Sequence, residues 1–346
     1  MSINKFDIPT LELVELAAKL PEGGLGNISR VQSGLAMLVA LESINMRQNE
    51  DPVPVLRKAL SDAKGVLSAT FSIAPELERS QLNNNSVEIG LEHTINLFEN
   101  AWTTYTLETY EHSLKLVKER LKASGFDAQY FLGKNCFDGG CGTGRLAIAM
   151  AQMGAKKVTA IDLGTESLEY FHKIVEHYGI KNIEIIEHDV TKLTAWQDGT
   201  YDFVASNGVL HHTENCDRGI REHFRITKPG GVFWVYLYGA GGFYWHLYDL
   251  LKPMVKNIPP SDIRKILSLF GLREGLIYTY LDNFLAPRIY YGRDQFLELL
   301  KEEGEFSWRH AKGMTEVDDT EILLNTAYGA QIYGPQGEVR LVVNKA

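Results

Sequence analysis

Glycines recur at short intervals in one stretch of this chain, and this stretch constrains the fold more than any other. An apolar segment ends in the acidic residue Asp138, is followed by glycines at positions 139, 140, 142 and 144, and then enters the helix-forming run 146–153. Glycine lets a backbone turn sharply and approach a ligand closely, because it carries no Cβ. The helix after such a turn exposes free N–H groups at its beginning. The stretch therefore predicts a strand, a ligand-binding turn and a helix.

The nature of the ligand depends on Asp138. The spacing of Gly142, Gly144 and Ala147 satisfies the loose fingerprint of a dinucleotide-binding turn, with Asp162 as a ribose ligand. A carboxylate at position 138, however, would repel a pyrophosphate and attract a cationic amine. A nucleoside that carries an amino acid therefore fits the turn better, and a nicotinamide dinucleotide is the alternative.

Three more short apolar segments follow, and each ends at or near a polar side chain. They are residues 158–162 with Asp162, residues 183–190 with Asp189, and residues 201–207 with Asn207. When such segments form parallel strands of an open α/β sheet, their carboxyl ends meet at one edge and form a crevice for a ligand. The order of the segments predicts a crevice of this kind.

The series of motifs resembles the class I S-adenosylmethionine-dependent methyltransferases. Residues 138–144 match the first motif of that family, which has the form acid-x-Gly-x-Gly-x-Gly. Residues 207–212 are similar to the fourth motif, and their Leu-His-His ending resembles the quinone-biosynthesis branch of the family. The resemblance covers about residues 126–240, with a weaker similarity over 286–346. It implies an α/β fold with a Rossmann-like, mostly parallel sheet and an antiparallel last strand.

The same resemblance implies S-adenosyl-L-methionine as the cofactor. Asp138 and the glycines would hold its methionine part, and Asp162 would bind its ribose hydroxyls. Asp189 would bind the adenine amino group, with Val190 beside the ring. The full set of implied cofactor-binding residues is Asp138, Gly139, Gly140, Gly142, Gly144, Asp162, Leu163, Asp189, Val190 and Asn207.

His211 and His212 are the predicted catalytic residues, because they follow the fourth strand at the place where the methyl group should point. The sulfonium methyl is already electrophilic, so the protein mainly has to align a nucleophile with it. A general base is needed only when the nucleophile arrives protonated, and histidine titrates near neutral pH. A hydrogen-bonding wall is the alternative role for either ring. No metal site is expected, because His211, His212 and Glu214 are too close in sequence to converge on one ion.

Helical patterns flank the predicted sheet on both sides. We expect a helical domain over 1–85, a helical leader that covers the cofactor over 86–125, the cofactor-binding core over 126–240, a helical lid over 241–290, and the rest of the core over 291–346. In the family, such additions commonly wall the substrate pocket. The predicted pocket residues are the aromatic Trp102, Tyr105, Tyr110, Tyr236, Tyr238 and Tyr244. The buried faces of helices are the alternative explanation for them.

Composition sets limits on partners and location. The 346 residues carry a net charge of −9, which argues against a protein that binds long nucleic acid through its phosphates. The three cysteines, at positions 136, 141 and 216, are expected to be packed thiols in a reducing cytoplasm. The sequence predicts neither a signal peptide nor a membrane span. We expect a small-molecule or peptide substrate, no membrane partner and, by the resemblance, a homodimer formed through the N-terminal helices.

The sequence therefore predicts a methyltransferase that acts on oxygen or nitrogen of a small or medium-sized metabolite, as in natural-product biosynthesis, or of a peptide. One competing function is a methyltransferase that modifies tRNA or protein, for which a compact surface of Lys and Arg would be the sign. A modest basic cluster exists at Lys252, Lys256, Arg264, Lys265 and Arg273. An NAD(P)-dependent oxidoreductase and a protein that binds the cofactor without turnover are the two remaining candidates.

Overall fold

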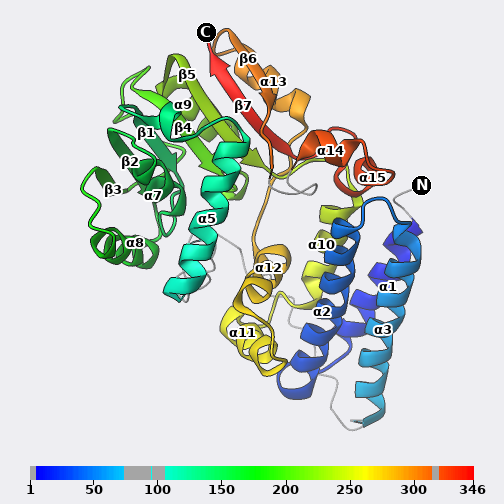
Figure 1. Ribbon diagram of the computed structural model, residues 1–346. Helices are drawn as coiled ribbons and strands as arrows, with labels where there is room; N and C mark the ends of the chain where they lie inside the picture. The colour runs from blue at the N-terminus through cyan, green and yellow to red at the C-terminus, as the bar shows by residue number, and fades with distance from the viewer. Residues whose placement is uncertain (1–4, 74–94, 96–105, 314–318) are drawn as a thin grey trace. The chain divides into compact units, whose positions relative to one another are not determined.

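The computed structural model describes residues 5–73, 95, 106–313 and 319–346 (Figure 1). The chain divides into two compact units. The helical unit consists of Met1–Gly90, Gly241–Ala286 and Asn325–Pro335, and the sheet unit consists of Leu91–Ala240, Pro287–Leu324 and Gln336–Ala346. Each unit is therefore built from segments that are far apart in the sequence.

A seven-stranded sheet forms the centre of the sheet unit, in the order β3-β2-β1-β4-β5-β7-β6. The strands are β1 (Asn135–Gly139), β2 (Lys157–Asp162), β3 (Ile183–Glu187), β4 (Tyr201–Asn207), β5 (Thr227–Leu237), β6 (Phe306–His310) and β7 (Val339–Lys345). Strands β1 to β5 are parallel, whereas β7 runs antiparallel to both β5 and β6. The predicted α/β fold with an antiparallel last strand is confirmed. The strand order reverses between β1 and β4, which is where open α/β sheets bind their ligands.

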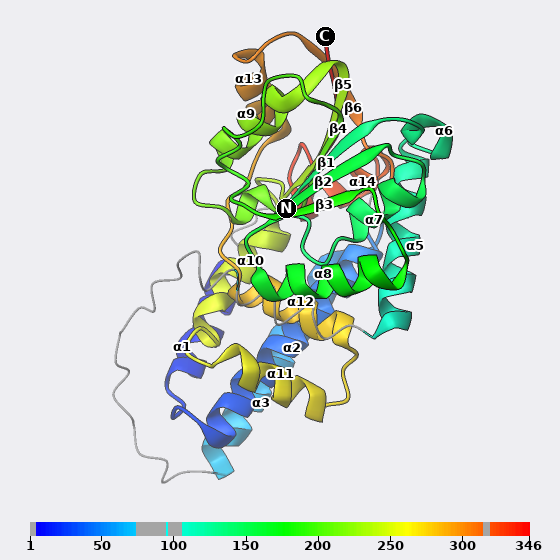
Figure 2. The same ribbon diagram turned by 90° about the vertical axis from the view of Figure 1, so that its left-hand side faces the viewer.

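Helices cover both faces of this sheet (Figure 2). They are α5 (Leu107–Ala123), α6 (Ala128–Phe131), α7 (Arg145–Gln152), α8 (Thr165–His177), α9 (Cys216–Ile226), α13 (Arg293–Lys301) and α14 (Thr320–Leu324), with the short 3-10 helix η2 (Leu210–His212). Successive strand residues point to opposite faces. On β4, Phe203 joins one core cluster and Val204 the other, and on β5 Trp234 and Phe233 divide in the same way. The central strands are thus buried on both faces, as the apolar segments predicted.

The helical unit combines the N-terminal helices with those that follow β5. Its helices are α1 (Asp7–Ala18), α2 (Gly24–Met46), α3 (Pro52–Ile73), α10 (Phe243–Leu251), η3 (Lys252–Met254), α11 (Pro260–Leu269), α12 (Glu274–Leu285) and α15 (Gly329–Tyr333). Helix α10 packs against α1, α12 and α15, and α2 packs along α3. Gly34 lets α12 approach α2, because a Cβ at this position would lie 2.2 Å from the Tyr280 hydroxyl. Most of the segment expected as a lid, 241–290, therefore lies in one unit with the N-terminal helices, as Gly241–Ala286, whereas Pro287 begins a segment of the sheet unit.

Buried polar side chains fix the packing inside the helical unit. The Tyr244 hydroxyl donates a hydrogen bond to the carboxylate of Glu42, and the Tyr333 hydroxyl donates to Asn45 Oδ1 at 2.6 Å. Burial raises the pKa of Glu42, although its hydrogen bonds with Tyr244 and Asn45 oppose the shift. These bonds join α10 and α15 to α2. Among the helices that the structure describes, none is long and apolar enough to cross a membrane.

Candidate active site

The turn between β1 and α7 is held in place by main-chain hydrogen bonds. The N–H groups of Gly140 and Cys141 both donate to the Ile161 carbonyl at 2.9 Å, and the N–H of Gly144 donates to the Cys141 carbonyl at 2.8 Å. Gly142 has a φ of +50°, and no atom lies within 4 Å of the position that a Cβ would occupy there. The main chain is therefore fixed while the space beside Gly142 stays open, as close approach of a ligand requires.

Asp138, at the end of β1, is almost completely buried, with 2% of its surface exposed. Its Oδ2 atom accepts no hydrogen bond from the residues that the structure describes. Burial raises the pKa of Asp138 to about 7; the N–H of Ala147 opposes this shift, and the carboxylate of Asp162 adds to it. A buried carboxylate oxygen without a donor is costly. An ammonium group would supply both the donor and the opposite charge, so the turn fits the methionine part of S-adenosylmethionine.

Asp162, at the end of β2, binds the glycine turn directly. Its Oδ2 atom accepts from the N–H of Gly142 at 2.7 Å, and its Oδ1 atom accepts from the N–H of Gly164 at 2.9 Å. Burial raises the pKa of Asp162, although these main-chain bonds oppose the shift. The residue thus holds the turn, a role that the sequence did not indicate. Both oxygens keep a lone pair for a further donor, so ribose binding by Asp162 and its half-buried neighbour Leu163 stays a prediction.

Asp189, which follows β3, stabilises its own turn. Its Oδ1 atom accepts from the N–H and the hydroxyl of Thr191 at 2.8 and 2.7 Å, and Lys192 Nζ lies 2.9 Å from its Oδ2 atom. Burial would raise the pKa of Asp189, but the bonds from Lys192 and Thr191 outweigh it and lower the pKa. Val190 is buried next to it, and Asn207 is half-buried at the end of β4. Their contacts with the adenine and the rest of the cofactor stay predictions.

His211 and His212 lie in η2, shortly after β4. The His211 ring is completely buried, and neither of its nitrogens has a hydrogen-bond partner in the described part of the chain. His212 differs, because its Nδ1 atom lies 2.7 Å from the Pro287 carbonyl oxygen and carries the proton when it donates to that oxygen. Burial lowers the pKa of His211 well below its usual range, and the neighbouring His212 and Arg288 lower it further. His211 is therefore the neutral ring with available nitrogens, and His212 is anchored.

Residues 287–291 run beside η2 and the end of β5. The N–H of Ile289 donates to the His211 carbonyl at 2.8 Å, and the N–H of Tyr291 donates to the Tyr238 carbonyl at 3.0 Å. This segment therefore ties the histidine pair and the end of β5 to one another.

Two predicted pocket residues, Tyr236 and Tyr238, pack around His211. The centre of the Tyr238 ring lies 3.9 Å from that of His211, with 32° between the ring planes, and the Tyr236 ring lies at 6.1 Å. The His212 ring lies at 4.1 Å. Aromatic rings thus surround His211 and shield it from water.

Two of the other predicted pocket residues have different hydrogen-bond partners. Tyr110, on α5, is buried and donates its hydroxyl to the Thr143 carbonyl at 2.8 Å, so it supports the glycine turn. Tyr244 belongs to the helical unit, where its hydroxyl donates to the Glu42 carboxylate. Trp102 and Tyr105 lie outside the residues that the structure describes.

Sequence reasoning missed a largely buried ion pair next to Tyr236. The Arg340 guanidinium lies 3.8 Å from the centre of the Tyr236 ring and donates to the Glu338 carboxylate at 3.1 Å. Tyr236 and Arg340 are partners in the register of β5 and β7. No local pattern could have shown the contact between Tyr236 and Arg340, because these residues are more than a hundred positions apart.

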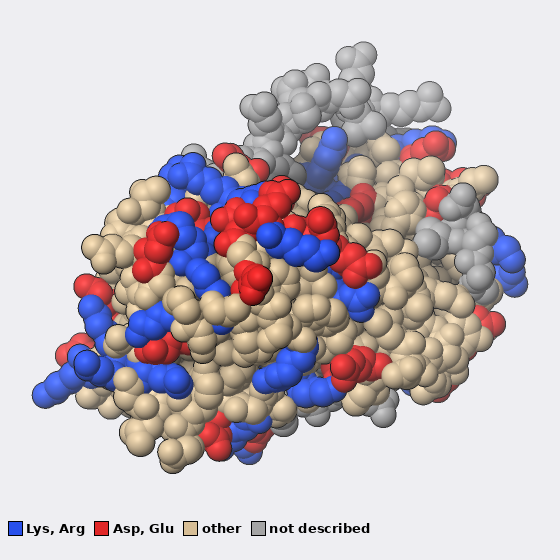
Figure 3. All heavy atoms as spheres, turned by 90° about the horizontal axis from the view of Figure 1, so that it is seen from above, with Lys and Arg blue, Asp and Glu red and all other residues tan. Residues whose placement is uncertain are grey.

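Two expectations about charge and metal can be compared with the structure. Within the described residues, no group of His, Cys, Asp and Glu could hold a metal ion. Three members of the basic cluster form ion pairs, namely Lys252 with Asp249, Arg264 with Glu274, and Lys265 with Asp262. On the face shown in Figure 3, basic and acidic side chains are interspersed. The charge of the basic cluster is therefore largely compensated by neighbouring carboxylates.

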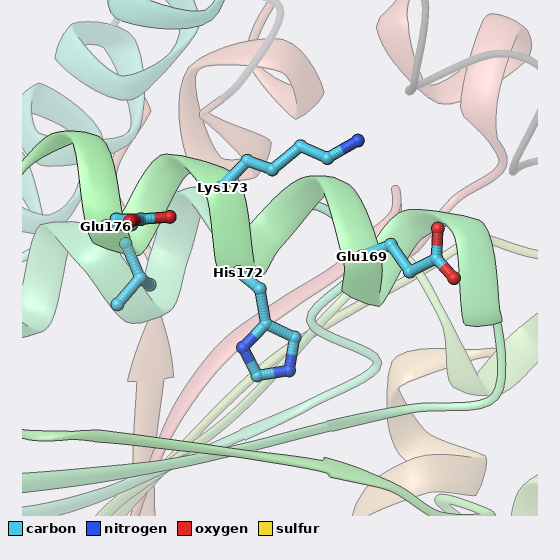
Figure 4. A pocket seen from close by; sticks show the side chains of 5 residues that line it. Glu169, His172, Lys173 and Glu176 are labelled. Atoms are coloured by element: carbon cyan, nitrogen blue, oxygen red, sulfur yellow. The ribbon is translucent and has the colours of Figure 1, made fainter.

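An open hollow of about 550 Å³ lies on the exposed side of α8. It is lined by Glu169, His172, Lys173, Val175 and Glu176. Figure 4 shows that the labelled side chains all project from this one helix. His172 is exposed there, in contrast to the buried His211, and provides a surface histidine for comparison.

Several known proteins similar to this chain are methyltransferases. A family model described as a methyltransferase domain matches residues 137–235. The ubiquinone biosynthesis O-methyltransferase of Acinetobacter baylyi is 35% identical over 175 residues, which cover 45% of this chain and 73% of that protein. The protein of the same name from Escherichia coli O6:H1 is 32% identical over 162 residues, which cover 46% of this chain and 67% of that protein.

Further matches are shorter or weaker. The ubiquinone biosynthesis O-methyltransferase of Bordetella avium is 37% identical over 107 residues, which cover 30% of this chain and 42% of that protein, so less than half of that relative is spanned. Among solved structures, a chain of the complex between the Haloferax volcanii Trm112 methyltransferase activator and a methyltransferase has a TM-score of 0.45 and 14% identity. That match covers 73% of this chain and 97% of the other.

Proposed function

Because this chain belongs to the class I S-adenosylmethionine-dependent methyltransferases, we propose that it methylates a hydroxyl oxygen of a small or medium-sized aromatic metabolite. Its relatives carry the name of O-methyltransferases, which favours oxygen over nitrogen as the acceptor atom. The matched segments cover less than half of this chain, so the acceptor itself is not carried over from them. Because this family uses S-adenosylmethionine, its membership excludes the alternative of a nicotinamide dinucleotide as the cofactor.

The state of His211 is the observation that carries this proposal. Its imidazole is buried and neutral, and both of its nitrogens lack a hydrogen-bond partner among the described residues. Buried polar groups are normally satisfied, so each exception calls for an explanation. An acceptor hydroxyl that donates to His211 would satisfy the ring, and the neutral ring could accept the hydroxyl proton.

The chemistry divides simply between cofactor and protein. When bound, S-adenosylmethionine supplies a methyl group on a positively charged sulfur. The protein aligns the acceptor oxygen with that carbon, and His211 takes the hydroxyl proton as the new C–O bond forms. The cofactor would keep the electron pair of the broken C–S bond, and His211 would hold the proton, so that charge is balanced. The Tyr238 ring, tilted by 32° with its centre 3.9 Å from that of His211, fixes the orientation of His211 and helps to exclude water.

The surface charges support a small acceptor. The ion pairs of Lys252, Arg264 and Lys265 reduce the positive field that a polynucleotide would need. A cytoplasmic location and a homodimer through the N-terminal helices stay predictions from the sequence. Size-exclusion chromatography with light scattering would measure the oligomeric state.

The proposed function is tested by incubating the purified protein with S-adenosylmethionine and a panel of phenols, catechols and aryl amines. Mass spectrometry should detect a product that has gained one methyl group on oxygen. Products methylated only on nitrogen, or only on added tRNA or protein, would contradict the proposal.

A set of histidine variants tests the role of the base. His211→Ala should lower kcat by a factor of about 100 or more and leave the dissociation constant of the cofactor unchanged. His172→Ala, on the exposed side of α8, serves as the matched control and should behave like the wild type. If His211→Ala retains full kcat, or weakens only the binding of the acceptor, His211 is a wall and not a base.

A further inference from the structure

One face of the sheet carries a row of four polar side chains near its carboxyl edge. They lie on β1, β4, β5 and β7, and they are Asp138, Asn207, Tyr236 and Arg340. Side chains two residues apart on a strand share a face, and each of the four lies two positions from a member of one core cluster, namely Cys136, Ala205, Trp234 and Val342. Tyr236 is in register with Asn207 on one side and with Arg340 on the other. The row therefore leads from the carboxylate suited to the cofactor ammonium, through Tyr236, to Arg340.

Arg340 holds the Tyr236 ring from one side. The central carbon of its guanidinium lies 3.8 Å from the ring centre, which is the geometry of a cation–π contact. Its Nε and Nη2 atoms donate to one carboxylate oxygen of Glu338 at 3.3 and 3.1 Å. Only 13% of the Arg340 side chain and 6% of the Glu338 side chain are exposed. Glu338 thus fixes the guanidinium, and the guanidinium fixes the ring.

Tyr236 connects this ion pair to the histidine. Its ring centre lies 6.1 Å from that of His211, with 67° between the ring planes, and 5.8 Å from that of Tyr238, with 62° between the planes. Tilted arrangements of this kind are favourable contacts between aromatic rings. Tyr236 itself is half-buried, so part of its surface stays open to an acceptor. A chain of contacts therefore runs from Glu338 through Arg340 and Tyr236 to His211.

We propose that Arg340 is a positioning residue for methyl transfer, which holds the Tyr236 ring in place as one wall of the acceptor site. This inference rests on the proposed function and adds a residue that acts through another. In-line displacement requires the acceptor oxygen to be aligned closely with the methyl carbon, so a wall that moves loses productive alignment. The planar guanidinium can stack on the ring and pair with Glu338 at the same time.

Arg340→Lys separates positioning from stability. Lysine keeps a positive charge beside Glu338, so the sheet unit should stay folded, but it has no planar group to stack on the ring. For the compound of the acceptor panel with the highest kcat/KM, the variant should raise KM about fivefold or more. The dissociation constant of S-adenosylhomocysteine should not change. Arg293→Lys is the matched control, because the Arg293 guanidinium also lies over an aromatic ring, that of Trp308, at 5.4 Å, and it should keep the wild-type KM.

Two further variants show whether Arg340 acts through Tyr236. Tyr236→Leu should raise KM by itself, and Arg340→Lys should raise it no further in that background, because the contact is already lost. The double variant Glu338→Gln with Arg340→Gln removes both charges and leaves no unpaired buried carboxylate. It should raise KM as Arg340→Lys does. Calorimetric titration of the protein loaded with S-adenosylhomocysteine should show the same weakening for binding of the acceptor.

Each outcome decides the inference. A wild-type KM in Arg340→Lys and in the double glutamine variant, a rise that Arg293→Lys shares, or additive effects of Tyr236→Leu and Arg340→Lys would overturn it. A lower melting temperature with a wild-type KM would show that the ion pair only stabilises the sheet. If O-methylated product still forms and depends on His211 in these cases, only the role of Arg340 is wrong. If no O-methylated product forms from any acceptor, the proposed function itself fails.

Discussion

Asp138 should make the affinity for S-adenosylmethionine depend on pH, and the size of the effect follows from its pKa. In the free protein this pKa is about 7, mainly because the carboxyl is buried. The cofactor ammonium needs the ionised carboxylate, so binding below pH 7 must first remove a proton. For one such group, the apparent dissociation constant should rise about 16-fold between about pH 7 and about pH 5.5.

The raised pKa of Asp138 also makes the folding stability depend on pH in the absence of cofactor. The pKa of Asp138 is raised above its unfolded value, so the folded protein binds more protons than the unfolded chain between about pH 4 and pH 7. The stability contributed by this group is therefore present at low pH and is lost as the pH rises through 7. Asp138→Asn, which cannot ionise, should raise the free energy of unfolding of the cofactor-free protein above pH 7, by at most about 4 kcal/mol.

Isothermal titration calorimetry can directly measure the coupling between cofactor binding and the ionisation of Asp138. At about pH 7, binding should release about half a proton, seen as a dependence of the heat on the ionisation enthalpy of the buffer. Asp138→Asn should bind the cofactor more weakly and lose this pH dependence. Asp198→Asn, an exposed carboxylate paired with Arg225, is the control and should keep it. An affinity that stays flat from pH 5.5 to 7 in the wild type, or an unchanged slope in Asp138→Asn, would refute the assignment of Asp138.

Three further variants test the glycine turn. Asp162→Ala should weaken cofactor binding about 100-fold and also lower the melting temperature, because the N–H of Gly142 loses its acceptor at 2.7 Å; calorimetric binding equal to the wild type would contradict this. Gly142→Val should abolish binding, since a side chain would fill the open space and strain a φ of +50° by about 1–2 kcal/mol; equilibrium dialysis with labelled cofactor measures the loss. Tyr110→Phe removes the hydrogen bond to the Thr143 carbonyl and should cost about 1 kcal/mol in urea unfolding, whereas a larger effect on kcat than on stability would instead place Tyr110 in the substrate pocket.

The strands of the sheet could be predicted because each of them is recognisable from its own short run of residues. Strands that are buried on both faces appear as short apolar runs, and the polar residue that ends each run marks the carboxyl edge of the sheet. The run 201–207 coincides with β4, and Asp162 is the last residue of β2. The beginning of β5 cannot be identified in this way, because the strand includes the Pro-Gly-Gly sequence after Lys228, which normally signals a turn. Pairing of Thr227 with Tyr201 extends the strand over those residues.

The organisation of the helical unit could not be predicted in the same way. An amphipathic pattern shows that a helix has a buried face, but it does not show which other helix covers that face. The hydrogen bond between Glu42 and Tyr244 and the close approach of Tyr280 to Gly34 join segments about 200 or more residues apart. Each contact depends on the packed structure as a whole. The sequence therefore predicts a separate lid after β5, whereas Gly241–Ala286 forms one unit with the N-terminal helices.

The distinction between the two neighbouring histidines shows most clearly what the structure adds. In the sequence, His211 and His212 are equivalent candidates for a base. In the structure, the Pro287 carbonyl engages His212, while the nitrogens of His211 have no partner among the described residues. Asp138 Oδ2, at the end of β1, also has no hydrogen-bond partner among the described residues. A sheet edge selected only for stability would satisfy such groups. Two unsatisfied groups after adjacent parallel strands, one suited to a cation and one to a hydroxyl, are what a cofactor and its acceptor would complete.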